Sequence, residues 1–122
     1  MSKNQYANFY AALSDNEELE ISVSYSLGTA SSWWDGKPRP RGLKVSFTPV
    51  TRTVNGGWAG ISYMIGDDRG RGFHVVNLAR RSDKRGEALA AFIKTNLEQL
   101  SEAGVRQDWR TVNNILSTYS AK

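Results

Sequence analysis

The 122-residue sequence contains no cysteine and one histidine, and these scarcities exclude several kinds of site. Without cysteine the chain forms no disulfide and offers no thiolate to a metal, which fits a reducing compartment such as the cytoplasm. With His74 as the sole histidine, a zinc site would need carboxylates for nearly all of its ligands. A lone histidine in a strand is more often a structural or surface residue. No serine occurs in a nucleophile-elbow pattern, so we predict no catalytic residues, no cofactor and no enzymatic activity.

Long apolar runs are also missing. No run approaches the ~18–20 residues that span a bilayer, and the N-terminus lacks the basic start and apolar run of a signal peptide. The composition, 39% hydrophobic and 23% charged, is near the globular average. We therefore expect one soluble, cytoplasmic domain over residues 1–122, without a membrane partner.

Basic residues are plentiful and are gathered in the middle of the chain. Residues 37–85 hold 11 of the 16 lysines and arginines but only three of the 12 acids, a net charge of +8. Residues 1–36 carry −4, and residues 86–122 are neutral. A basic region of this kind is typical of a surface that binds a polyanion.

The same central region has the alternating pattern of a β-sheet. Apolar and polar residues alternate in three segments, and in a fourth the adjacent Val75 and Val76 leave the phase open. Together they predict strands at about 19–27, 43–54, 58–65 and 73–79. Short turns join the last three, and Asn55-Gly56-Gly57 is a strong hairpin signal. We therefore predict an antiparallel meander. Pro49 indicates an edge position or a bulge in the second strand.

Three segments have helical spacing. Apolar residues at Leu89, Phe92, Ile93, Leu97 and Leu100 predict a long helix over about 84–102, covering one face of the sheet. Ser82 or Asp83 can cap it, and Asp108 can cap a C-terminal helix over about 108–119. Tyr6, Phe9, Tyr10 and Leu13 predict a short N-terminal helix within 4–13. The predicted fold class is α+β.

Two connections concentrate residues suited to binding. The loop 28–42 places Trp33 and Trp34 beside three cations, and one of the two indoles is expected either to anchor the loop or to stack on a ligand. The turn 66–72 contains two aspartates, but its three glycines and two arginines indicate a solvated hairpin rather than a metal site. Its glycine spacing joins two strands, so it is not a dinucleotide motif.

The predicted sheet has one face covered by helix and one face suited to single-stranded nucleic acid. Cations that follow the phosphates and aromatic rings that stack on bases are the two ingredients of such binding. A duplex reader more often presents a basic helix to the major groove, whereas here the cations lie on strands and turns. The predicted nucleic-acid-binding residues are Trp33, Trp34, Lys37, Arg39, Arg41, Lys44, Arg52, Trp58, Arg69, Arg71, Arg80 and Arg81.

The layout of four strands and a long packing helix resembles the Whirly- and Pur-type single-stranded nucleic-acid-binding folds. The residues that carry the resemblance are GKPRPRGLKVSF (36–47), RTVNGGWAGISYMI (52–65) and RGFHVVNLARRSDKRGEALAAFI (71–93). The likeness is one of order and spacing over residues 19–100, and no diagnostic motif accompanies it. It implies that an open sheet face holds unpaired bases and that the chain assembles as a homodimer or a higher homo-oligomer.

A second class of function fits the same residues. Tryptophan and arginine are also enriched at protein–protein hot spots, so the chain could instead be a small protein-binding module or inhibitor, of the kind that phages and mobile elements carry. The dependence of binding on salt separates the two, because counterion release weakens only the nucleic-acid complex steeply.

Overall fold

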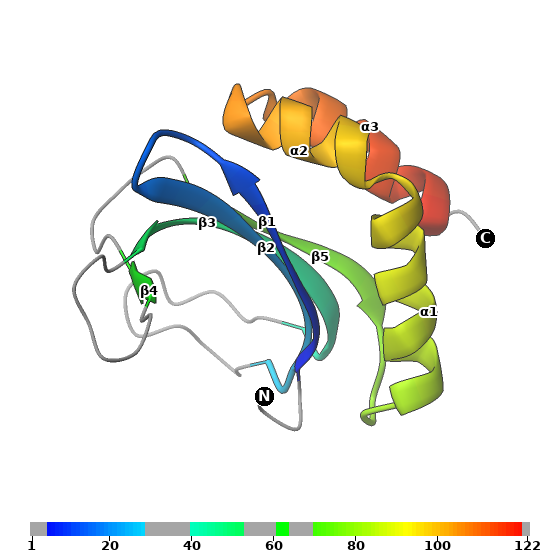
Figure 1. The fold of residues 1–122 in the computed structure, drawn as a ribbon. Coiled ribbons are helices and arrows are strands. Elements are labelled where there is room, and N and C mark those ends of the chain that lie inside the picture. Colours follow the sequence, from blue (N-terminus) through cyan, green and yellow to red (C-terminus); the bar gives the residue numbers. More distant parts are fainter. Residues whose placement is uncertain (1–4, 29–39, 53–60, 64–69, 121–122) are drawn as a thin grey trace.

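The computed structural model describes residues 5–28, 40–52, 61–63 and 70–120. Within these residues the chain forms an antiparallel sheet with its helices on one side, which confirms the α+β class (Figure 1). The elements are β1 (Gln5–Ala12), β2 (Glu17–Ser26), β3 (Gly42–Arg52), β4 (Ile61–Tyr63), β5 (Arg71–Asn77), α1 (Asp83–Thr95), α2 (Leu97–Val105) and α3 (Trp109–Ser120).

The sheet is built around β3. The strand order is β1–β2–β3, and the far edge of β3 is shared by β5 and β4. β5 pairs with residues 42–47 of β3, and β4 pairs with residues 50–52. The described strands therefore differ from the predicted meander at its last step, since β5 pairs with β3 and not with β4. With 11 residues, β3 is long enough to take both partners one after the other.

Pro49 lies where β3 changes partner. The strand runs through Pro49 without a bulge, and Pro49 pairs in register with Leu19 of β2. The residues that pair with β5 end at Phe47, and those that pair with β4 begin at Val50. A proline has no backbone N–H to donate. Pro49 suits this position because neither β5 nor β4 pairs with it.

The N-terminal residues form a strand, so the predicted N-terminal helix is wrong. β1 pairs with β2, and Phe9 and Ala11 lie opposite Ile21 and Leu19. Tyr10 points to the other face and is 42% exposed. The apolar residues whose spacing predicted a helix therefore lie on both faces of a strand. The pairing of β1 with β2 determines that this segment is a strand.

The hydrophobic core lies between the sheet and the helices. The predicted alternation in β2 is confirmed, because Leu19, Ile21, Val23 and Tyr25 are at most 5% exposed. Leu27, expected on the same face, is 62% exposed because β2 ends at the preceding residue. The other buried members of the core are Leu43, Val45, Phe47, Val75, Leu89, Ile93, Leu100, Ala103, Val112 and Leu116.

The predicted long helix is divided into α1 and α2 at Asn96. This residue has φ −103° and ψ 16°, and its side-chain amide donates to the carbonyl four residues earlier at 2.9 Å. Leu89, Ile93 and Leu100 are buried on both sides of the break. The apolar stripe is therefore continuous in sequence while the chain changes direction (Figure 1).

Two side-chain caps set the starts of the helices. The Ser82 hydroxyl accepts the Arg85 N–H at 3.3 Å at the start of α1. The Asp108 carboxylate accepts the Thr111 hydroxyl at 2.7 Å and the Thr111 N–H at 3.3 Å at the start of α3. These hydrogen bonds lower the pKa of Asp108 from its ordinary value of 3.8. Both caps agree with the sequence prediction.

Two glycines bring the helices close to the sheet. A Cβ at Gly86 in α1 would lie 2.4–2.5 Å from atoms of the Tyr6 ring. A Cβ at Gly104 in α2 would lie 2.8 Å from Leu19 and 2.9 Å from Phe47. The absence of a side chain at both positions therefore permits the observed contact between α1, α2 and the β1–β2 half of the sheet.

Candidate nucleic-acid interface

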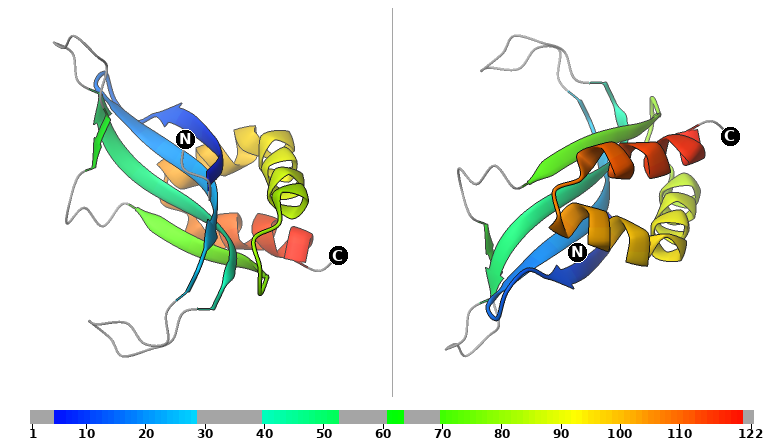
Figure 2. Two further views of the ribbon diagram at one scale, coloured as in Figure 1. Left: turned by 90° about the horizontal axis from the view of Figure 1, so that it is seen from below. Right: turned by 90° about the horizontal axis from the view of Figure 1, so that it is seen from above.

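One face of the sheet carries small polar side chains in place of a core. Because neighbouring residues of a strand point to opposite faces, Ser22, Ser24, Lys44 and Ser46 point away from the helices. We name the face that these four residues define the serine face. No helix of the described residues packs on it (Figure 2).

The middle of the serine face is a row of very small side chains across three strands. Ser22 lies opposite Ser46, and Ser46 lies opposite Gly72. A Cβ at Gly72 would meet only the Ser46 oxygen, at 3.9 Å. Ser22 is 9% exposed, so the accessible part of the row is Ser46 and Gly72. A flat ring can approach the backbone closely at this place.

The next row joins a cation to an aromatic ring. Lys44 lies between Ser24 on β2 and His74 on β5. Lys44 and His74 are both exposed, and the His74 Nε2 lies 2.6 Å from the Asn77 Oδ1. No salt bridge of Lys44 occurs among the described residues. Its ammonium group is therefore available to an anion on the serine face.

The opposite end of the sheet is acidic. Glu17, Glu18 and Glu20 lie where β2 begins, and Glu17 pairs with Thr51 near the end of β3. The Tyr10 hydroxyl donates to Glu20 at 3.2 Å. A polyanion is therefore repelled from this end of the serine face and attracted to the end where β3 begins.

The beginning of β3 and the end of β5 form a basic end. The Leu78 N–H donates to the Arg41 carbonyl at 3.1 Å, which brings Arg41 beside the bend that carries Arg80 and Arg81. All three arginines are exposed. Folding thus gathers cations separated by about 40 residues in the sequence near Lys44.

Arg81 takes part in a link between the sheet and α1. The Arg81 Nε lies 3.4 Å from an Asp83 oxygen, and the same oxygen accepts the Tyr6 hydroxyl at 3.3 Å. Burial, and then the negative charge of Asp83, raise the pKa of Tyr6 above its ordinary value of 10.0. Arg81 is therefore a weaker candidate for binding than Arg41 or Arg80.

The structure describes the side chains of only some predicted binding residues. Arg41, Lys44, Arg71, Arg80 and Arg81 are described and exposed. Arg52 ends β3 opposite Ile61, and its side chain lies outside the description. Trp33, Trp34, Lys37, Arg39, Trp58 and Arg69 also lie outside the described residues.

Arg71 does not share the serine face. It lies opposite Phe47, a core residue, and therefore on the helix side of the sheet. The expectation that the cations lie on the side away from the helices thus holds for Lys44 but is wrong for Arg71.

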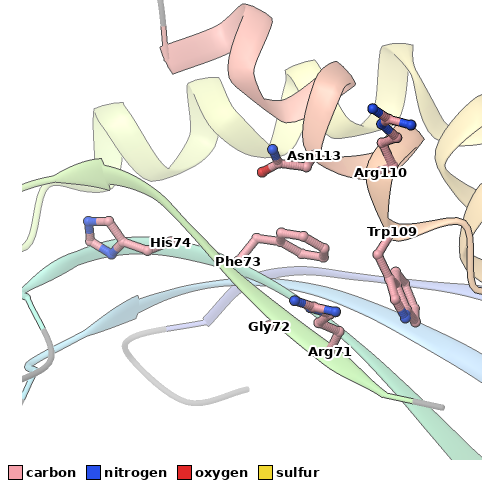
Figure 3. A pocket seen from close by; sticks show the side chains of 7 residues that line it. All are labelled: Arg71, Gly72, Phe73, His74, Trp109, Arg110 and Asn113. Carbon is pink, nitrogen blue, oxygen red and sulfur yellow. The ribbon is translucent and has the colours of Figure 1, made fainter. Parts of the chain in front are cut away.

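A pocket opens along the outer edge of β5, where α3 passes over it (Figure 3). Its volume is about 490 Å³, and we name it the β5 pocket. The pocket is lined by Arg71, Gly72, Phe73 and His74 from β5, and by Trp109, Arg110 and Asn113 from α3. It holds two arginines and no carboxylate among its lining residues.

Sequence reasoning missed the α3 half of this pocket. The apolar spacing within residues 108–119 predicts that Trp109 is a core residue, and Trp109 does pack on Phe47 and Phe73, with ring centroids 5.5 and 6.1 Å away. Trp109 is nevertheless only partly buried. The four-residue spacing of Trp109 and Asn113 places them on one face of a helix, but only the folded chain reveals that this face meets β5.

Comparisons with protein-family models, curated proteins and solved structures found no match to this chain. In the described ranges no helix has the length and apolarity to cross a membrane. The same residues contain no cluster of three or more side chains suited to a metal ion.

Proposed function

We propose that this protein binds single-stranded nucleic acid, DNA or RNA, with little sequence preference. The observation that carries the proposal is the row Ser24–Lys44–His74 beside the row Ser46–Gly72. Among the described residues, a cation without a salt bridge and a ring lie next to a row of small side chains, at the basic end of a face that no helix covers.

Each part of this surface has a use in holding a strand. Bases can lie flat over Ser46 and Gly72, and the hydroxyl groups can hydrogen-bond to base edges or phosphates. Lys44, Arg41 and Arg80 can follow the phosphates, which gives affinity without sequence information. The predicted stacking residues Trp33, Trp34 and Trp58 belong to the same hypothesis but lie outside the described residues.

The arrangement favours single strands over a duplex. The apolar sides of the three described helices pack on the sheet, so none of these sides is available to a groove. A duplex also offers no exposed base faces to a flat surface, whereas a single strand does. The resemblance to Whirly- and Pur-type folds, and the homo-oligomer it implies, stay predictions.

The test is a titration of labelled (dT)20, (rU)20 and a 20-base-pair duplex, read by fluorescence anisotropy at about 50 and 200 mM salt. Three phosphate contacts predict a slope of log K against log salt near −2, and thus about a 20-fold loss of affinity over this range. Binding of both single strands with this loss supports the proposal. If neither single strand binds, the proposal is overturned. A strong preference for the duplex overturns it as well.

A further inference from the structure

We propose that the β5 pocket holds one nucleotide of the bound strand. The base lies against Phe73 and Trp109, and its phosphate binds at the rim of the pocket, where Arg71 and Arg110 supply the positive charge. This inference rests on the proposed function for the path of the strand, but the pocket can be tested alone with a mononucleotide.

The aromatic wall of the pocket is held rigidly from behind. Phe73 and Trp109 each pack on Phe47, with centroid distances of 5.8 and 5.5 Å and edge-on geometry. Neither ring is fully buried, and both line the pocket (Figure 3). Rings fixed in this way lose little freedom when a base stacks on them, which favours binding.

Two guanidinium groups reach the pocket from different elements. Arg71 comes from the strand and Arg110 from the helix, on either side of the aromatic rings (Figure 3). Both are exposed, and no salt bridge of either occurs among the described residues. The nearby Asp108 carboxylate is hydrogen-bonded to Thr111. Guanidinium groups bind the oxygens of phosphates and of carboxylates in pairs of parallel hydrogen bonds, so a phosphate is one anion that suits them.

The rest of the lining suits a base. Asn113 can both donate and accept hydrogen bonds, as the edge of a base requires. The volume of about 490 Å³ lies in the usual range for small-molecule sites, about 300–1,000 Å³. An acidic peptide could use the arginines but would leave the aromatic wall without a planar partner. A nucleotide uses both.

The pocket is connected to the serine face through His74. This residue pairs with Lys44 on the serine face and also lines the pocket. Among the described strands β5 pairs only with β3, so its outer edge bounds the sheet. A single strand of nucleic acid that lies along Lys44 and His74 can therefore pass over this edge of the sheet and place one nucleotide in the pocket.

The experiment uses the full chain labelled with ¹⁵N and titrated with adenosine 5′-monophosphate, adenosine, inorganic phosphate and an acidic peptide. The readout is the indole N–H signal of Trp109, assigned by comparison with Trp109→Phe. We expect the monophosphate to shift this signal and to bind at least several-fold more tightly than adenosine or phosphate alone. Arg110→Ala should weaken the monophosphate about tenfold. The matched control Arg106→Ala, an exposed arginine outside the pocket, should bind as the unmodified chain does.

The outcomes separate this inference from the proposed function. If (dT)12 binds but neither it nor the monophosphate moves the Trp109 signal, the pocket assignment is overturned and the serine-face proposal stands. If the monophosphate shifts Trp109 but no oligonucleotide binds, the pocket holds nucleotides and the proposed function falls. A response to the acidic peptide alone overturns the nucleotide assignment. Well-dispersed spectra of both alanine variants verify that they are folded.

Discussion

Reversal of the charge at Lys44 tests directly whether single-stranded nucleic acid binds on the serine face. Lys44 is exposed between Ser24 and His74 on the serine face. In water a cation about 6 Å from a phosphate contributes about 0.7 kcal/mol, so Lys44→Glu changes the interaction by about 1.4 kcal/mol, or tenfold in Kd. Screening at about 0.1 M salt, where the Debye length is about 10 Å, reduces this to three- to tenfold.

The matched control is Lys94→Glu. Lys94 is an exposed lysine in the last turn of α1, in the helix layer on the other side of the sheet, and its reversal gives the same net charge. Because a negative charge near the C-terminus of a helix opposes the helix dipole, Lys94→Glu should cost about 0.3–1 kcal/mol of stability. It should leave the Kd for the oligonucleotide within about twofold of that of the unmodified chain.

The assay is anisotropy of labelled (dT)20 for both variants over a range of salt. Lys44→Glu should also reduce the magnitude of the salt slope by about 0.7, the contribution of one phosphate contact to a single strand. Equal losses in the two variants would show that only net charge matters, and the serine face would then have no special role. Loss of a dispersed NMR spectrum in Lys44→Glu would point to misfolding, and Lys44→Gln would then replace it.

Three further predictions concern the fold. Gly86→Ala should destabilise the protein by about 1–2 kcal/mol in urea unfolding, because overpacking against Tyr6 outweighs the gain in helix propensity; an unchanged midpoint would refute the close contact. Phe47→Ala should cost about 3–5 kcal/mol and expose Trp109, seen as a red shift of fluorescence; a loss under 1 kcal/mol would contradict its central position. The lowered pKa of Asp108 implies stability that is present above pH 3.8 and lost as the pH falls through the lower, folded-state pKa. Asp108→Asn should therefore melt below the unmodified protein at pH 6, with a difference in Tm that shrinks as the pH is lowered below 3.8, and a constant difference in Tm would count against this cap.

The strands of the core could be predicted because period-two alternation is a strong signal when one face is buried. Ile21 and Val23 in β2 follow this pattern directly. β1 carried the same signal, since Ala7, Phe9 and Ala11 alternate, but two of these residues are alanines and contribute little apolar contrast. The tyrosines at helical spacing masked the pattern, and only pairing with β2 resolves the ambiguity.

The breaks in regular structure could not be predicted from periodicity. Asn96 ends α1 within an unbroken apolar stripe, because its side chain satisfies a carbonyl of the preceding turn. In β5 a bulge lies between the residues paired with Leu43 and Lys44, so Val75 and Val76 both reach the core side. That bulge explains why two adjacent valines left the phase of this strand open.

The part of the candidate site on the serine face could be predicted, because it follows from the alternation of apolar and polar residues in the strands. The β5 pocket could not be predicted, because it depends on the topology of the fold. The phase of β3 places Lys44 and Ser46 away from the core, as the sequence indicates. The meeting of β5 with α3 depends on how the chain returns after α2, which no local pattern encodes. Arg71 was predicted in a turn at the rim of the sheet, whereas β5 begins at this residue, and pairing with Phe47 places its side chain on the helix side.

The most direct measurement of the central claim is a map of amide shifts in the ¹⁵N-labelled chain on addition of unlabelled (dT)12. We predict the largest shifts at the backbone amides of Lys44, Ser46, Gly72 and His74. The amides of exposed residues on α1, such as Ala91 and Lys94, should stay in place. Shifts gathered on the exposed side of α1, with the four serine-face positions unmoved, would contradict the account.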